Sequence, residues 1–246
     1  MRIPPPRPPA LLILALALLV PFRSAAQMEA VDLGLSVKWA SCNLGASKPK
    51  DAGKFYAWGE TKAKTVFSEN NYSLYKPGPG IDGRLNAREY LLTKYCSDVA
   101  TIGQAPGVYG DVDGKLVLEP EDDPARKALG GKWRVPTVAE RDELVSKCNW
   151  RWTKEGGVPG YRVTSKKNGN SIFLPAAGYY RDAFHYRSGE MGFYWAASVN
   201  PKKPIEACYL GFSEEKIVPG IDENYKLGEP VYTWLRHFGF SIRPVQ

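Results

Sequence analysis

Short runs of alternating apolar and polar residues are spaced along most of the chain, and glycine and proline separate them. Alternation with a period of two predicts strands that bury one face. The predicted strands are residues 37–42, 54–58, 150–153, 161–164, 171–175, 192–198, 206–212 and 239–245. Asn168-Gly169 lies between the fourth and fifth of these runs, and Asn-Gly favours a tight hairpin turn because both residues tolerate a positive φ. The pattern indicates a fold dominated by antiparallel strands.

Two segments carry the signals of a helix instead. In residues 122–131 an aspartate can cap the free N–H groups, Pro124 suits the first turn, and glycine suits the exit. Thr137 and Glu140 have the spacing of a capping box at the start of the second segment. Residues 138, 144, 145 and 148 then give this segment an apolar side. We expect two helices in an α+β domain.

The polar residues 62–86 are rich in Asn, Gly and Pro, which predicts a long loop. A second loop is predicted over residues 178–187, where aromatic and charged side chains alternate. Loops on a rigid frame are where ligand contacts usually occur.

The amino-terminal residues have the three parts of a secretory signal peptide. Arg2 and Arg7 supply positive charge, residues 11–20 are apolar, and small residues end at Ala26. The apolar run is shorter than the roughly 20 residues that span a bilayer. We therefore expect a signal peptide over residues 1–26 and one domain over residues 27–246, with no transmembrane segment after cleavage. The expected location is the periplasm, the outer surface or the extracellular space.

Charge and cysteine content narrow the class of protein further. Loss of three arginines with the signal peptide would lower the formal net charge from +7 to +4, and the remaining Lys and Arg are interleaved with acids, which argues against nucleic acid as a partner. The chain has no C-x-x-C motif, so a zinc or redox site is not expected. Export permits disulfides among Cys42, Cys96, Cys148 and Cys208. Cys42 and Cys148 are the suggested pair, and burial as small apolar residues is the alternative.

Several motifs resemble those of a family of exported proteins. They are residues 31–40, 42–46, 56–61, 118–123, 131–137, 170–178, 194–198 and 239–245. In this order they resemble the Fibrobacter succinogenes major paralogous domain of exported Bacteroidetes proteins. The resemblance implies a C-type-lectin-like fold, with a twisted, mainly antiparallel sheet, two helices and long loops. It also implies ligand binding through loops of the carboxyl-terminal half.

The expected function is that of a non-catalytic recognition or adhesion module for a glycan or protein ligand at the cell surface. Sugars stack on aromatic faces while polar groups bind their hydroxyls, so aromatic residues with charged neighbours are the candidates. The candidate ligand-binding residues are Tyr179, Tyr180, Arg181, Tyr186, Tyr232, Trp234 and Arg236. The tryptophans at positions 39, 58, 133 and 195 are expected in the core.

Two other functions remain as alternatives. One is an enzyme of the formylglycine-generating type, which needs a late cysteine pair and copper, whereas only Cys208 is late in this chain. The other is a structural subunit of a surface or fimbrial assembly. Neither His185 nor His237 has a visible nucleophile or acid partner, so we expect no catalytic residues.

We expect no cofactor, with calcium as the open alternative. Asp111 and Asp113 precede a turn glycine, and Glu119 and Glu121 flank a proline, but neither pair completes a calcium loop.

Overall fold

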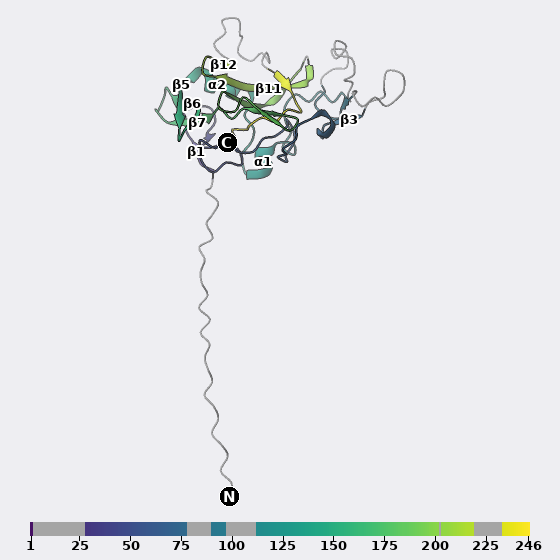
Figure 1. Cartoon of the computed structure of the whole chain (residues 1–246), viewed down its shortest axis with the longest axis horizontal. Helices are drawn as coiled ribbons and strands as arrows, with labels where there is room; N and C mark the ends of the chain where they lie inside the picture. Colours follow the sequence, from purple (N-terminus) through teal and green to yellow (C-terminus); the bar gives the residue numbers. More distant parts are fainter. Residues whose placement is uncertain (2–27, 78–89, 97–111, 202, 219–232) are drawn as a thin grey trace.

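The computed structural model describes residue 1 and residues 28–77, 90–96, 112–201, 203–218 and 233–246 (Figure 1). The expected signal peptide lies outside the described residues, except for Met1. The helices are the 3₁₀ helix η1 (Glu69–Asn71) and the α-helices α1 (Pro124–Leu129) and α2 (Val138–Lys147). The strands are β1 (Ala30–Val31), β2 (Trp39–Ala40), β3 (Tyr75–Pro77), β4 (Tyr90–Leu92), β5 (Cys148–Glu155), β6 (Val158–Ser165), β7 (Ser171–Pro175), β8 (Tyr179–Arg181), β9 (Phe184–Tyr186), β10 (Met191–Asn200), β11 (Lys203–Ser213), β12 (Ile217–Val218) and β13 (Thr233–Leu235).

The strand pairs named here are all antiparallel, and they form small sheets. The sheet β10–β11 extends to β12 at one end of β11 and to β13 at the other. A second sheet has the order β5–β6–β7. The pairs β1–β2, β3–β4 and β8–β9 are separate ribbons. The fold is therefore α+β with mostly antiparallel strands and two α-helices, as the sequence predicted.

Both α-helices begin where their capping signals predicted. The Asp123 carboxylate accepts hydrogen bonds from the backbone N–H groups of Ala125 and Arg126, and α1 ends at Gly130. Thr137 Oγ1 accepts from Glu140 N, and the Glu140 carboxylate accepts from Thr137 N. Each cap satisfies backbone donors that a helix leaves unpaired at its start.

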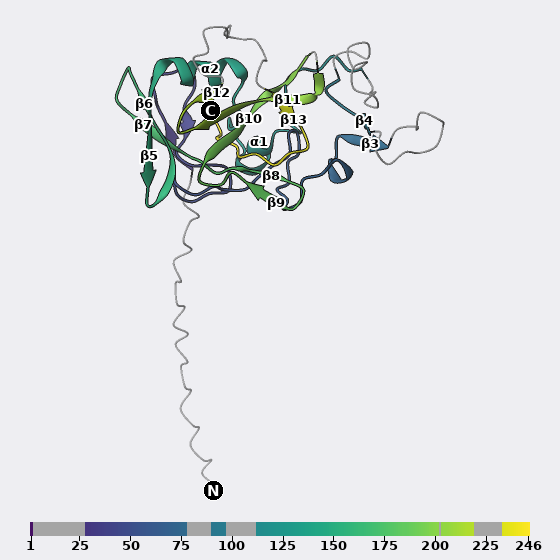
Figure 2. The ribbon, with the colours of Figure 1, turned by 45° about the horizontal axis from the view of Figure 1, so that its top comes forward.

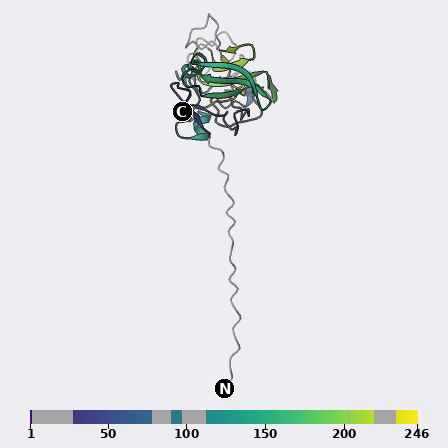
Figure 3. The same ribbon diagram turned by 90° about the vertical axis from the view of Figure 1, so that its left-hand side faces the viewer.

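The predicted Asn-Gly hairpin joins β6 to β7 in the sheet on the side of the molecule that faces the viewer in Figure 3. Gly169 has a φ of 77°, and Thr164 lies opposite Ser171. Asn168 does not take a positive φ; its Nδ2 donates to Asp32 O, and this bond ties the turn to the amino-terminal segment. Figure 2 shows α2 running above this sheet and beside β10 and β11.

Two predicted strands are extended segments instead. Residues 54–58 and 239–245 meet at a single bridge between Tyr56 and Phe240. Residues 239–245 do not pair with one neighbour, because successive residues bridge to different segments, with Ser241 opposite Tyr194 for example. A strand needs a continuous partner, and these segments have none.

Other predicted elements are shortened or altered. Only Trp39–Ala40 forms a strand within residues 37–42. The predicted loop 62–86 contains η1 and β3 in its described part, residues 62–77. The predicted loop over residues 178–187 is the β8–β9 hairpin.

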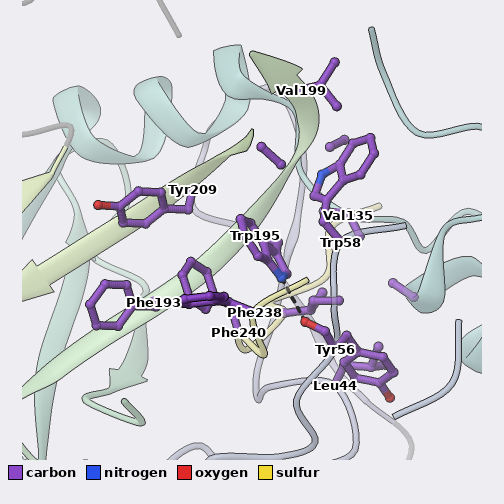
Figure 4. Packing of buried hydrophobic residues seen from close by; sticks show 14 of the residues in the cluster. Leu44, Tyr56, Trp58, Val135, Phe193, Trp195, Val199, Tyr209, Phe238 and Phe240 are labelled. Atoms are coloured by element: carbon purple, nitrogen blue, oxygen red, sulfur yellow. Dashed lines mark hydrogen bonds between the residues drawn. The ribbon is translucent and has the colours of Figure 1, made fainter. Parts of the chain in front are cut away.

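The main core lies against one face of β10 and β11 (Figure 4). Trp195 is its centre: the indole ring stacks on Phe240 with ring centroids 4.1 Å apart, and Nε1 donates to Tyr56 O at 2.8 Å. Trp39, Trp58 and Trp195 are buried, as expected, whereas Trp133 is only half-buried. A second core, which includes Leu33, Trp39 and Leu144, joins α2 to the β5–β7 sheet.

Buried arginines connect the elements of both cores. Arg243 donates to Asn43 Oδ1, Ala40 O and Phe173 O, and burial lowers the pKa of its guanidinium. Arg141 pairs with Asp142 at 2.8 Å on α2 and donates to Tyr209 O in β11. Such side chains satisfy backbone carbonyls that would otherwise be buried without a partner.

Cys42 and Cys148 are free thiols in buried positions, so the suggested disulfide is not formed in this structure. Cys42 Sγ donates to Ala46 O, and Cys148 packs in the second core. Cys96 and Cys208 are also buried. Burial raises the pKa of Cys148 and of Cys208 to about 11, which keeps both thiols protonated at neutral pH.

Candidate functional site

A cleft of about 600 Å³ lies between η1, β8 and β13. It is lined by Ser68, Glu69, Asn70, Tyr179, Arg181, Asp182, Glu206, Thr233, Trp234, Leu235, His237 and Phe238. The structure therefore brings together two groups of predicted ligand-binding residues that are about fifty positions apart in the sequence. Tyr179 and Arg181 come from β8, and Trp234 comes from β13.

The β8–β9 hairpin decides which of its residues face this cleft. Tyr179 lies opposite Tyr186, and these residues share one face of the hairpin with Arg181. Tyr180 and His185 are on the other face, where their rings stack at 4.3 Å and Tyr180 meets Phe55 edge-on. The prediction that Tyr180 contacts a ligand in this cleft is therefore wrong, because its ring packs beneath the hairpin.

Aromatic rings form one wall of the cleft. Tyr179 is nearly parallel to Phe238, with ring centroids 5.9 Å apart and planes 9° apart. Trp234 stands 6.3 Å from Tyr179 and is 37% exposed, so its indole ring is available to a ligand. Tyr186 stacks on Tyr179 at 5.3 Å but is not part of the lining. The wall offers apolar faces of the kind on which a sugar ring stacks.

Polar groups surround this wall. Thr233 Oγ1 donates a short hydrogen bond to Glu206 Oε2 and accepts one from Asn200 Nδ2. Arg181 lies over the Phe238 ring, with Cζ 5.8 Å from the ring centroid. Asp182, at the turn of the hairpin, has a φ of 51°. A positive φ is uncommon for a residue other than glycine, although aspartate tolerates it better than most.

His237 is the buried polar residue of the cleft. Its side chain is 5% exposed, and Nδ1 has no hydrogen-bond partner among the described residues. Burial, together with the positive charges of Lys64 and Arg181, lowers its pKa to about 4. The imidazole is therefore neutral at physiological pH.

We expect this histidine to make the protein less stable in mild acid. The unfolded chain binds a proton near pH 6.5 and the folded chain near pH 4, so stability is complete above pH 6.5 and falls as the pH drops towards 4. The expected loss between pH 7 and pH 5 is about 2 kcal/mol. Urea unfolding at both pH values measures it. The His237→Phe variant, which keeps the ring contact with Phe238, should lose that part of the pH dependence; an unchanged slope would contradict the assignment.

Arg236 does not belong to the ligand-binding group. It is fully buried, and its guanidinium donates to Tyr72 Oη, Pro204 O and Lys94 O. The Cζ atom also lies 4.7 Å from the ring centroid of Trp58. Arg236 thus packs beneath β13, where it binds neighbouring segments, and does not reach a ligand. Tyr232, another predicted contact residue, lies outside the described residues.

Two of the acidic residues considered for calcium, Glu119 and Glu121, surround a lysine together with Asp122. The carboxylates of Glu119, Glu121 and Asp122 have oxygen atoms within 4.8 Å of one another. Lys94 Nζ lies 2.5 Å, 3.1 Å and 2.6 Å from them, in that order. Hydrogen bonds from Lys115 and Lys94 lower the pKa of Glu119 to about 2. The ammonium group of Lys94 thus occupies the position that a calcium ion would need.

The other calcium candidate is a turn. Asp113 accepts backbone hydrogen bonds from Tyr95, Cys96 and Lys115, so its carboxylate organises the chain around it. Asp111 lies outside the described residues.

Sequence reasoning missed most of the polar lining. Ser68 and Asn71 have the spacing of a capped turn, with Ser68 N donating to Asn71 Oδ1 at 3.1 Å, and this signal could have located η1. Glu206 and Phe238 carry no local signal, because their place in the cleft depends on how β11 and β13 pair.

The described residues have an α+β fold with a cleft that is lined by aromatic and acidic side chains. No protein-family model matches the chain, and searches of curated proteins and of solved structures find no significant match. Within the described residues, no helix has the length and apolar character needed to cross a membrane.

Proposed function

We propose that this protein is an exported, non-catalytic recognition module that binds a glycan in the cleft between η1, β8 and β13. The observation that carries the proposal is the combination, in one cleft of about 600 Å³, of an aromatic wall with carboxylates and a hydroxyl. Glycans need this combination because their C–H faces stack on rings while their hydroxyls need hydrogen-bond partners.

A C-type-lectin-like fold within the Fibrobacter succinogenes major paralogous domain family is part of this proposal. The motif series in the sequence supports it, as do the antiparallel strands, the two α-helices and the irregular connections. Export to the periplasm or cell surface is supported by the signal-peptide pattern of residues 1–26.

Two features favour binding over catalysis. Burial holds the thiol of Cys208 protonated, which does not suit a cysteine of the formylglycine-generating type. The low pKa of His237 makes it a weak base at neutral pH. A structural role in a surface assembly remains the alternative, and co-purification in a polymer would support it.

Trp234→Ala is expected to weaken glycan binding by about thirtyfold, or about 2 kcal/mol, because it removes the exposed ring of the wall. Because the ring also packs against Phe193, Tyr209 and Phe238, the melting temperature should fall as well, so binding is measured at a temperature where the variant is folded. The assay is a glycan array with residues 27–246, followed by calorimetry on the tightest glycan.

Phe184→Ala is the matched control, since Phe184 is 65% exposed on the same hairpin but does not line the cleft. We expect it to bind as the unmodified protein does. Equal losses in both variants would place the binding surface on the outer face of the hairpin, and no binding to any glycan would overturn the proposed function.

A further inference from the structure

The charge of the cleft is opposite to the charge of the chain. The chain has a formal net charge of +7, or +4 over residues 27–246. Among the described residues that line the cleft, Glu69, Asp182 and Glu206 are acidic and Arg181 is the basic residue. His237 adds no charge at neutral pH because its pKa is about 4. The lining thus has an excess of negative charge on a protein that is otherwise basic.

Among the described residues, no lysine or arginine lies within hydrogen-bond distance of the Asp182 or Glu206 carboxylate. Arg181 Nε is 3.9 Å from Asp182 Oδ2, and Lys203 Nζ is 3.9 Å from Glu206 Oε1. Both distances exceed that of a hydrogen bond, and exposed pairs of this kind interact weakly. Lys64, whose charge acts on His237, is bound to Glu60 at 2.7 Å. Within the described residues, the Asp182 carboxylate and Oε1 of Glu206 therefore remain available to a ligand, whereas Oε2 of Glu206 accepts from Thr233 Oγ1.

An independent observation indicates that the cleft is built for a polar ligand. His237 is 95% buried in the cleft wall, yet in the part of the chain that the structure describes Nδ1 has no hydrogen-bond partner. A buried polar atom without a partner costs roughly 1–3 kcal/mol, and because Nδ1 is enclosed in this structure a ligand group offsets that cost only where the cleft wall shifts to expose it. The aromatic wall adds a place for a sugar ring beside it.

We propose that the cleft selects glycans by charge, binding saccharides with free, protonated amino groups more tightly than their N-acetylated counterparts and rejecting acidic saccharides. This inference rests on the proposed function. An ammonium group on a ring stacked against Trp234 lies near the carboxylates of the lining, and a cation also interacts favourably with an indole face. A uronate group in the same position is repelled.

The test compares three tetrasaccharides of equal length: glucosamine tetramer, N-acetylglucosamine tetramer and galacturonate tetramer. Calorimetry at about pH 6 keeps the amines protonated and His237 neutral. We expect the amine form to bind about tenfold more tightly than the acetylated form, and the galacturonate form not to bind. The preference should shrink as salt is added, because surface charges are screened over about 8 Å at 0.15 M ionic strength.

A double variant identifies the residues responsible. Asp182→Asn with Glu206→Gln removes two charges while keeping similar shapes; asparagine tolerates the φ of 51°, and glutamine keeps an oxygen for Thr233. The expected result is equal binding of the amine and acetylated forms. Glu214→Gln with Glu215→Gln is the control, since these acids follow the far end of β11 and should leave the preference unchanged.

The outcomes separate this inference from the proposed function. Equal binding of the amine and acetylated forms by the unmodified protein, or binding of galacturonate, overturns the charge selection and leaves glycan binding in place. Failure of the glucosamine tetramer alongside binding of other glycans on the array has the same meaning. If no glycan on the array binds, the proposed function itself fails.

Discussion

Arg236→Met is expected to lower the free energy of unfolding by about 3–5 kcal/mol, because several buried acceptors lose their donor at roughly 1–3 kcal/mol each. Methionine matches the length of the arginine stem but cannot donate hydrogen bonds. Its introduction leaves the carbonyls of Lys94 and Pro204 and the hydroxyl of Tyr72 without their donor. Because small domains are stable by only about 5–15 kcal/mol, this one substitution removes a large part of the total.

Urea unfolding of Arg236→Met beside Arg181→Met tests the assignment, since both variants lose the same charge. Arg181 has a side chain that is 62% exposed, so its replacement should change stability by less than about 0.5 kcal/mol while altering ligand binding. A stable Arg236→Met protein with weakened glycan binding would contradict this assignment and show that Arg236 contacts the ligand.

Gly178→Ala is expected to cost about 3 kcal/mol and to displace the β8–β9 hairpin. Gly178 has a φ of 68°, and a Cβ atom added there would lie 2.2 Å from Tyr186 O and 2.7 Å from Ser188 N. Both are backbone atoms of the segment that begins in β9, so they move only if the hairpin moves. Since Tyr179 and Arg181 are on that hairpin, glycan affinity should fall as well.

Gly169→Ala separates the cost of the positive φ from the cost of the close approach to Tyr186. Gly169 has a φ of 77°, but a Cβ atom there meets nothing within 4 Å. It therefore measures the cost of the left-handed conformation alone, about 1 kcal/mol. Stability from urea unfolding and affinity from calorimetry should show a small loss for Gly169→Ala and a larger one, with weakened binding, for Gly178→Ala. Similar results for both variants would show that the contact with Tyr186 is not tight.

Elements with local causes could be predicted from the sequence. The start of α2 follows from the reciprocal bonds of Thr137 and Glu140, and the β6–β7 turn from Gly169, because the deciding atoms are within a few residues of one another. Apolar and polar side chains alternate along residues 239–245, which predicts a strand, yet the backbone partner changes at almost every residue. Alternation reports which side chains are buried and not which segment pairs with the backbone.

The candidate site was predictable to a smaller extent. Tyr179, Arg181 and Trp234 stand out by residue type, and all three line the cleft. Tyr180 and Arg236 are of the same residue types as these three and could not be told apart from them in the sequence. The two-residue period of the hairpin turns Tyr180 inward, and the core encloses Arg236. Aromatic and charged side chains serve both packing and binding, so only the fold distinguishes the two uses.

The hydrogen bonds made by residues 238–246 also determine when the amino-terminal half can finish folding during synthesis. Backbone N–H groups of Lys38, Ala40 and Leu44 donate to carbonyls of Gln246, Pro244 and Ile242, and Tyr56 pairs with Phe240. The amino-terminal half therefore lacks these partners until translation reaches residue 246, and contacts of such long sequence separation form slowly. Until these residues have been made, the nascent chain stays incompletely folded, which is the state in which a polypeptide can pass through a narrow channel.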